Sequence, residues 1–185
     1  MPAPDLMTEH GLDVKKGWFD MASLDYSAKL ASTITSFGVV RGRVVHLNTS
    51  GEFVPGAHKT CPAIFLLNGS DDADVSNPGT TASGNFMHRA IAPTGKMSGL
   101  VATGGYEISS TEYVSNLTYN PGDLLTATRT ATPASTDGRL TNASVTQFTT
   151  PVVGVVSSGA ATNHNGISAV SFWSVYLPGA SNWTP

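Results

Sequence analysis

The chain has 185 residues, of which 40% are hydrophobic and only 12% are charged, and its formal net charge is −3. This length fits one domain, or one domain with an arm, and the charged fraction is well below the roughly 25% of average soluble domains. Neither the net charge nor any basic cluster favours nucleic-acid binding, which requires cations to neutralise phosphates.

The first 36 residues differ from the rest and are predicted to form an extended N-terminal arm. They carry Trp18, Phe19 and Tyr26 without a clear hydrophobic period, and residues 24–34 could form either a short helix or an extended segment. Large apolar groups left in water mark interaction surfaces, so these aromatic residues are candidate partner-binding residues. The alternative is that Trp18 and Phe19 attach the N-terminus to the core of their own domain.

From residue 37 onward, short β-branched and apolar runs separated by turn residues predict strands. The first run, residues 37–47, has valine pairs on either side of Arg41-Gly42-Arg43, which favours a strand with a bend or bulge. No amphipathic helical pattern lies between the runs. Residues 37–185 are therefore predicted to form an all-β domain, either a small β-barrel or a compact sandwich. The further predicted strands are 63–67, 124–129, 145–149, 152–156 and 167–177.

Two short motifs carry specific structural expectations. Pro121-Gly122 is expected to form a turn that leads Asp123 into a strand. Gly154, between two valine pairs, is expected to allow another part of the chain to approach closely.

The last run, residues 167–177, alternates so that both of its faces carry large apolar side chains. Phe172 and Tyr176 share one face, and Trp173 lies on the other. One face can contact the core, and the other suits a subunit interface, where aromatic residues are enriched. Trp173 and Tyr176 are therefore also candidate partner-binding residues.

The sequence contains no recognisable metal-binding or nucleotide-binding motif. Its five histidines are dispersed, and a single cysteine, Cys61, excludes an intrachain disulfide and a cysteine-based zinc site. Cys61 is interpreted as a small buried hydrophobic residue. Asp71, Asp72 and Asp74 lack the glycine and distal glutamate of a calcium loop, so they are interpreted as a solvated acidic loop. No metal or cofactor is predicted.

Glu107 and Glu112 are the one pair that could serve as the carboxylates of a glycosidase. Residues five apart on a strand point to opposite faces, so this pair would need a bend to converge. Nucleophile-elbow and phosphate-loop motifs are also missing. We therefore predict no catalytic residue.

No segment resembles a signal peptide or a transmembrane helix. The N-terminus lacks a basic start followed by an apolar run, and the apolar stretches are strand-sized, far short of the roughly 20 residues that span a bilayer. The chain is therefore expected to be made in the cytoplasm of its host and to bind no membrane.

Several motifs occur in a characteristic order. Residues 119–125 read YNPGDLL, residues 151–156 read PVVGVV, and VSFWSVYLPG follows at 170–179. Together with FGVVRGRVVHL at 37–47, this order resembles the decoration, or cement, proteins of tailed bacteriophage heads, over residues 37–179. The resemblance implies a homotrimer seated where capsid subunits meet, on the outer surface of the virion, with the N-terminal arm reaching over neighbouring coat protein.

The sequence therefore predicts a non-enzymatic protein that stabilises a phage capsid by bridging subunits of the major capsid protein. Its predicted partners are that protein and further copies of itself. The alternative is a receptor- or carbohydrate-binding head of a phage fibre or tail protein. That function requires exposed aromatic residues on a loop surface, for which Tyr106, Tyr113 and Trp183 are the candidates. A glycan-degrading enzyme would rest on Glu107 and Glu112 alone.

Overall fold

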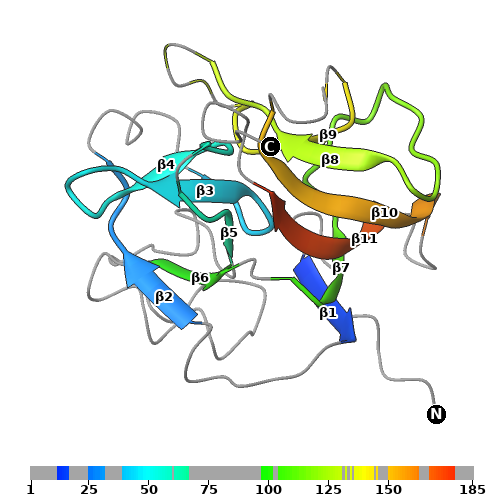
Figure 1. Cartoon of the computed structure of the whole chain (residues 1–185), viewed down its shortest axis with the longest axis horizontal. Helices are drawn as coiled ribbons and strands as arrows, with labels where there is room; N and C mark the ends of the chain where they lie inside the picture. Colours follow the sequence, from blue (N-terminus) through cyan, green and yellow to red (C-terminus); the bar gives the residue numbers. More distant parts are fainter. Residues whose placement is uncertain are drawn as a thin grey trace, which may run out of the picture.

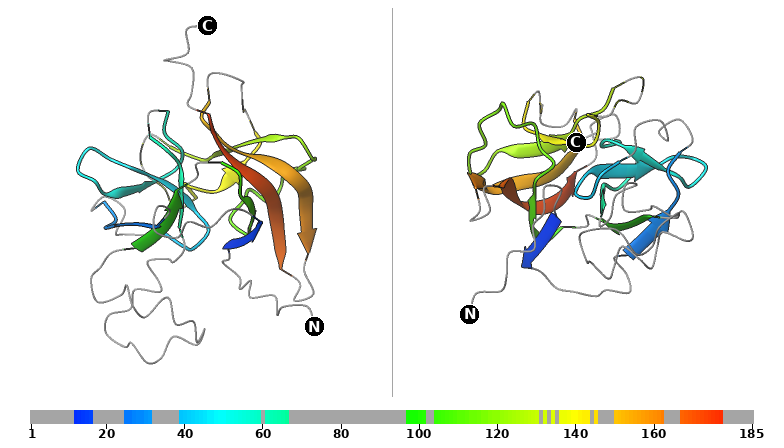
Figure 2. Two further views of the ribbon diagram at one scale, coloured as in Figure 1. Left: turned by 60° about the horizontal axis from the view of Figure 1, so that its bottom comes forward. Right: turned by 180° about the vertical axis from the view of Figure 1, so that it is seen from behind.

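The computed structural model describes residues 12–16, 25–31, 39–59, 61–66, 97–101, 104–130, 132, 134, 136–143, 145, 150–162 and 167–177. Within these residues all regular secondary structure is β-strand, arranged in two antiparallel sheets (Figures 1 and 2). The six-stranded sheet has the order β1-β7-β11-β10-β8-β9, and the five-stranded sheet has the order β2-β6-β5-β3-β4. The all-β prediction is confirmed, and its sandwich form applies because the sheets do not close into a barrel.

The strands are short except for the last two, which form a long antiparallel ribbon. Their bounds are β1 (Leu12–Lys16), β2 (Asp25–Ala28), β3 (Val44–Leu47), β4 (Phe53–Pro55), β5 (Ile64–Leu66), β6 (Met97–Val101), β7 (Glu107–Ser110), β8 (Leu124–Ala127), β9 (Leu140–Thr141), β10 (Val152–Thr162) and β11 (Ser168–Leu177). The predicted strands at 63–67, 124–129, 152–156 and 167–177 correspond to β5, β8, β10 and β11. In the run predicted at 145–149, Val145 is not in a strand, and the other residues lie outside the described part.

The main hydrophobic core lies between the two sheets. Phe172 of β11 and Phe65 of β5 are fully buried and meet across it, with their ring centroids 5.4 Å apart. Val170 and Ser174 are buried beside Phe172, which confirms the alternation predicted for this face of the closing run. The same cluster includes Val44, Leu100, Ile108, Tyr119, Leu125, Leu140, Val153 and Val156.

A second hydrophobic cluster covers the other face of the five-stranded sheet. Adjacent residues of one strand divide between the clusters: Val44 belongs to the main core and Val45 to the second cluster. Ala28 and Ala31, from the range predicted as an arm, complete the second cluster. Residues 25–28 of that range form strand β2 at the edge of the sheet, so the extended alternative applies there. The boundary at residues 36 and 37 stays a prediction.

The predicted bent strand at 37–47 is wrong in one respect, because a turn interrupts it. Arg41 and Gly42 form the turn, Gly42 has φ of 89°, and β3 begins only at Val44. Glycine adopts a positive φ without steric cost, and the Arg43 amide donates to the carbonyl oxygen of Val40 at 3.3 Å, which closes the turn. The Gly42 amide then donates to the carbonyl oxygen of Leu66 at 2.8 Å.

The two short motifs behave as predicted. Gly122 has φ of 93°, and the Asp123 amide donates to the carbonyl oxygen of Asn120 at 3.0 Å, so the turn leads directly into β8. Gly154 lies under the ring of Phe172, where a Cβ atom would come within 2.5 Å of Cδ2. No larger residue fits this site without displacing the Phe172 ring.

One buried ion pair connects the two sheets. Arg43 directly precedes β3 of the five-stranded sheet, and Glu112 follows β7 of the six-stranded sheet. Arg43 Nε donates to Glu112 Oε2 at 2.7 Å, and the exposed fractions of the two side chains are 7% and 5%. A second guanidinium nitrogen of Arg43 donates to the carbonyl oxygen of Asp137 at 2.9 Å, in the turn before β9. We call this the inter-sheet ion pair.

We expect Arg43→Met to lower the free energy of unfolding by about 3–5 kcal/mol, because it leaves the Glu112 carboxylate buried without its main counter-charge. The double variant Arg43→Met/Glu112→Leu should recover most of this loss, since removing both charges also removes the cost of burying them. Denaturant unfolding of the single and double variants measures the coupling. Lys59→Met, at an exposed cation, is the control and should change stability by less than about 0.5 kcal/mol. Equal losses in the single and double variants would contradict the assignment.

Deleting residues 1–36 should destabilise the protein rather than leave it unchanged. The deletion removes β2 from its pairing with β6, and it removes Ala28 and Ala31 from the cluster that covers Phe53. Phe53 is fully buried in the intact chain, and its amide donates to the carbonyl oxygen of Lys29 at 2.8 Å. Thermal unfolding of the two lengths tests this, and identical melting temperatures would show that residues 25–31 contribute nothing to the fold.

Candidate functional site

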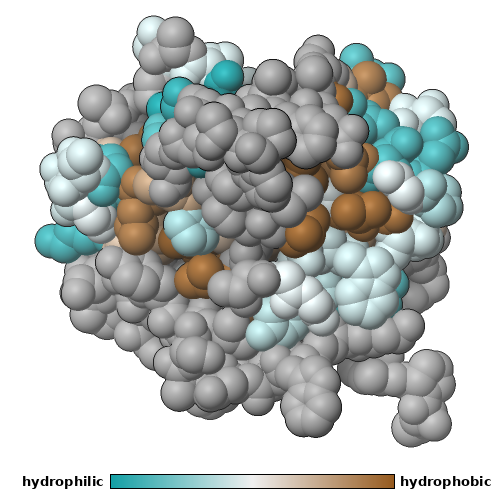
Figure 3. Space-filling model, viewed as in Figure 1, coloured by the Kyte–Doolittle hydropathy of each residue, from teal (hydrophilic) through white to brown (hydrophobic). Residues whose placement is uncertain are grey.

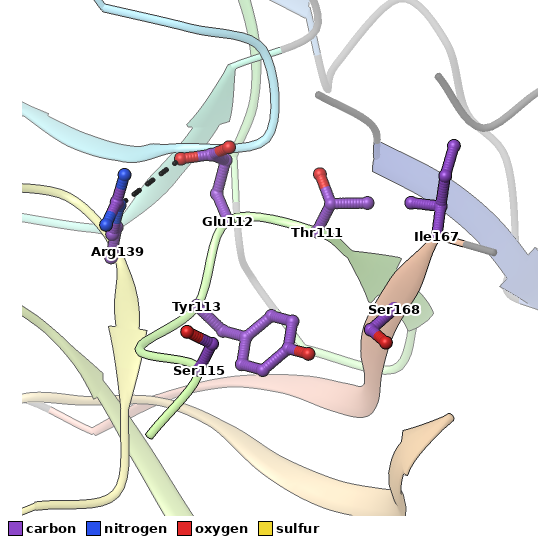
Figure 4. A pocket seen from close by; sticks show the side chains of 7 residues that line it. All are labelled: Thr111, Glu112, Tyr113, Ser115, Arg139, Ile167 and Ser168. Carbon is purple, nitrogen blue, oxygen red and sulfur yellow. Dashed lines mark ion pairs between the residues drawn. The ribbon is translucent and has the colours of Figure 1, made fainter. Parts of the chain in front are cut away.

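A pocket of about 370 Å³ opens where the loop after β7, the residue before β9 and the start of β11 come together (Figure 4). In this view the Tyr113 ring lies below the opening with its hydroxyl directed toward Ser168, and Arg139 lies on the opposite side. The lining is mainly polar. Thr111, Tyr113, Ser115 and Ser168 contribute hydroxyl groups, Glu112 and Arg139 an ion pair, and Ile167 an apolar side chain.

The loop that carries Tyr113 is held in place by backbone hydrogen bonds on either side. The Leu140 amide donates to the Glu112 carbonyl oxygen, and the Val114 amide donates to the Leu140 carbonyl oxygen, each at 2.9 Å. The ring of Tyr113 packs edge-on against Tyr119, with centroids 5.5 Å apart and planes at 85°. The Tyr119 hydroxyl donates to the carbonyl oxygen of Val114 at 2.9 Å, and burial raises the pKa of this phenol to about 12. The position of Tyr113 is therefore fixed by the Tyr119 ring and by the hydrogen-bonded backbone of its own loop.

The Glu112 carboxylate on the pocket wall lies between two arginines and is much closer to one of them. Glu112 Oε2 is 2.7 Å from Arg43 Nε but 3.7 Å from Arg139 Nε. The Arg43 side chain is buried, whereas that of Arg139 is 40% exposed. Arg43 therefore neutralises most of the Glu112 charge from inside, and Arg139 leaves positive charge at the opening of the pocket.

A second candidate surface lies on the outer face of the six-stranded sheet. Trp173 of β11 is 41% exposed there, which excludes it from the core that its neighbour Phe172 enters. It is flanked in register by Val155 of β10 and Glu107 of β7, both half-buried. Figure 3 shows apolar residues reaching the surface over the β10–β11 ribbon. We call Trp173 and Val155 the Trp173 face.

For the other predicted partner-binding residues, the structure describes at most the backbone. Trp18 and Phe19 lie outside the described residues. The backbone of Tyr26 pairs with Gly99 in the five-stranded sheet, and that of Tyr176 belongs to β11. The side chains of Tyr26 and Tyr176 also lie outside the described part.

The residues considered for the alternative functions do not lie together on one surface of the described structure. Tyr113 lines the pocket, Tyr106 is buried in the main core, and Trp183 lies outside the described residues. The two glutamates have different partners. Glu107, in register with Trp173, accepts from the Ser157 hydroxyl at 3.0 Å, and Glu112 accepts from Arg43 inside the molecule.

Among the described residues, Cys61 belongs to no set of metal ligands. Cys61 is half-buried, and its thiol donates to the carbonyl oxygen of Leu47 at 3.5 Å. Asp71, Asp72 and Asp74 lie outside the described residues. Elsewhere in the described part, no group of three or more His, Cys, Asp or Glu side chains is placed to hold a metal ion.

Two of the dispersed histidines, His46 and His58, lie side by side in the structure. The rings of His46 and His58 stack with centroids 4.9 Å apart. His46 Nδ1 donates to the carbonyl oxygen of Gly56 at 2.9 Å, since a carbonyl can only accept. Burial lowers the pKa of His46 to about 4, and the nearby positive charge of Arg129 adds to the shift. Burial also lowers the pKa of the more exposed His58.

No sequence pattern had singled out Arg139 or the serine and threonine residues of the pocket. Serine and threonine are too common in this chain to single out any position. Arg139 offered a weak signal, because it directly follows Asp137-Gly138, a dipeptide typical of turns, in a chain where only 12% of residues are charged. Arg41 and Arg43, inside an otherwise apolar run, were a stronger signal that a buried partner exists.

No protein-family model, no curated protein and no solved structure matches this chain. The resemblance to phage decoration proteins therefore stays a prediction from the sequence. Among the described residues, no helix has the length and apolar character needed to cross a membrane.

The buried His46 should make stability depend on pH. Its pKa is about 4 in the folded protein and about 6.5 when unfolded, so the unfolded state takes up a proton first as the pH falls. We expect the free energy of unfolding to decrease between about pH 6.5 and pH 4, by on the order of 1–2 kcal/mol after allowance for solvent screening. His46→Gln keeps a donor for Gly56 and should flatten this part of the profile, whereas His58→Gln should alter it less. Parallel profiles for the wild type and His46→Gln would refute the assignment.

Proposed function

We propose that this protein is a head decoration, or cement, protein of a tailed bacteriophage. It would act without catalysis, as a homotrimer that bridges subunits of the major capsid protein on the outer surface of the virion. Support comes from the motif order of residues 37–179 and from a fold that presents an aromatic residue on the outer face of a sheet.

The single observation that carries the proposal is the exposure of Trp173. A tryptophan that is 41% exposed on a regular strand leaves a large apolar surface in water. Val155 lies directly opposite it on β10 and extends the apolar surface. Tryptophan is among the residues that contribute most to binding energy when they become buried at an interface. The Trp173 face therefore suits contact with a protein partner.

The segments that carry the resemblance to decoration proteins also form the strands next to Trp173. The YNPGDLL motif forms the turn and strand β8, and the VVGVV motif forms the start of β10, which pairs with β8 on one side and β11 on the other. Gly154 admits the Phe172 ring against the backbone of β10, so Phe172 points inward. The strand alternation then directs the next residue, Trp173, outward.

The mechanism follows from repeated attachment. A trimer presents three copies of each contact surface, so several weak contacts act together once one of them has formed. Each contact buries apolar area that was exposed in the free protein, which stabilises the bound state. A capsid held across its subunit seams in this way would resist expansion without any chemical cross-link.

We expect Trp173→Ala to weaken association about 30-fold or more, as loss of a hot-spot tryptophan costs at least about 2 kcal/mol of binding free energy. It should leave the fold of the single chain intact, because the side chain lies outside the core, so the melting temperature should fall only by the part that trimer formation contributes. Mass photometry of the isolated protein measures trimer formation, and co-sedimentation with capsids from the virus that encodes the chain measures attachment. Copy number on purified particles, in the hundreds or only a few, separates a decoration protein from a fibre or tail part.

Two comparison variants make the result decisive. Ser158→Ala, at an exposed position of β10, should change neither association nor stability. Phe172→Ala removes a fully buried side chain and should cost about 3–5 kcal/mol of folding stability. Wild-type association by Trp173→Ala, both between copies and with capsids, would show that the Trp173 face binds neither partner.

A further inference from the structure

The pocket beside Tyr113 has the dimensions and rigidity of a small-molecule site. Its volume of about 370 Å³ is at the lower end of the range of roughly 300–1,000 Å³ in which ligand pockets occur. Its walls come from three separate parts of the chain, which lie side by side in Figure 4. The loop wall is anchored through Val114 and Leu140, as described above. A ligand would therefore find the site largely formed.

The charge of the pocket favours an anion. Arg43 and Arg139 are both near Glu112, so these groups sum to one positive charge. Glu112 Oε2 lies 2.7 Å from Nε of the buried Arg43 and 3.7 Å from Nε of Arg139, whose side chain is 40% exposed. A guanidinium presents a planar fork of donors that fits a carboxylate. The Arg139 Nε lies beyond hydrogen-bond distance of Glu112 Oε2.

The rest of the lining favours a ligand with hydroxyl groups and a ring. Hydroxyls of Thr111, Ser115 and Ser168 surround the opening, and each can both donate and accept. The Tyr113 ring is fixed at 85° to Tyr119, so it offers a stable surface on which the apolar face of a sugar ring can pack. Ile167 closes the side opposite Arg139.

We propose that this pocket binds one acidic sugar unit, of the uronic- or sialic-acid type, with its carboxylate on Arg139 and its ring on Tyr113. A neutral sugar would leave Arg139 without an anion, and a simple carboxylate would leave the hydroxyls and the aromatic ring unused. The site lies on the loop after β7 and the start of β11, and it does not depend on attachment to a capsid. Its occupant would be an acidic saccharide free in solution or at the end of a longer glycan.

Ligand-observed NMR and calorimetry with the full chain test the proposal. The probes are galacturonic acid, glucuronic acid and N-acetylneuraminic acid, each at up to about 20 mM, a range that reveals the millimolar affinity typical of single weak sites. Galactose is the neutral counterpart of galacturonic acid, and acetate is the carboxylate without a ring. At least one acidic sugar should bind about tenfold or more tightly than both galactose and acetate, since a charge-assisted hydrogen bond contributes at least that factor.

Variants locate the binding in the pocket. Arg139→Met should weaken the acidic sugar about tenfold or more, and Tyr113→Ala should do the same, whereas Arg129→Met, at an exposed arginine that does not line the pocket, should have no effect. Melting temperatures of all variants show whether the fold is kept, and Tyr113→Leu replaces Tyr113→Ala if that variant unfolds.

Three outcomes would overturn the proposal. The first is no binding of any of the three acidic sugars. The second is equal binding of galactose or acetate, which would indicate a site for sugars in general or for anions alone. The third is unchanged affinity in Arg139→Met. None of these outcomes bears on Trp173→Ala, so the pocket and the capsid proposal fail or stand separately.

Discussion

The inter-sheet ion pair between Arg43 and Glu112 is the contact on which the rest of the structure depends. Arg43 directly precedes β3, and Glu112 lies two residues after the end of β7, so the ion pair connects the two sheets. A buried charge without a partner is strongly destabilising, so once Arg43 is placed, Glu112 has to meet it. The neighbouring backbone follows: the Val44 amide donates to the carbonyl oxygen of Gly138 at 2.9 Å, which brings the turn before β9 against β3.

The same contact shapes the proposed sugar site. Glu112 is drawn inward by Arg43, and this leaves Arg139 with only a distant counter-charge at the surface. The polar pocket is therefore the outer end of a buried polar junction. Breaking the ion pair should affect both stability and the electrostatics of the pocket, whereas changing Arg139 should affect the pocket alone. This asymmetry follows from burial, because charges in the interior are screened less than charges at the surface.

The outer faces of the two sheets are covered to different extents. The five-stranded sheet is covered on both faces, since Val45, Ile64 and Leu66 pack with Ala28 and Ala31 in the second cluster. The six-stranded sheet leaves Trp173 exposed on its outer face. The N-terminal range therefore helps to cover the outer face of one sheet, while an aromatic residue stays exposed on the other. In the proposed function, this exposed residue contacts a second copy or the major capsid protein.

The sequence by itself determined the fold class, the Pro121-Gly122 turn and the inward face of the closing strand. These depend on local properties: β-branched runs, glycine at positive φ and alternation along a strand. Strand β7 was missed because three of its four residues are polar, and only pairing with β1 and β11 makes it a strand. Tertiary structure alone decided that Arg43 meets Glu112, 69 residues away, and that Tyr113, Arg139 and Ser168 line one pocket. It also decided that Trp173 lies outside the core. Such contacts join distant parts of the chain, and no local pattern of residues encodes which of many possible partners will be adjacent after folding.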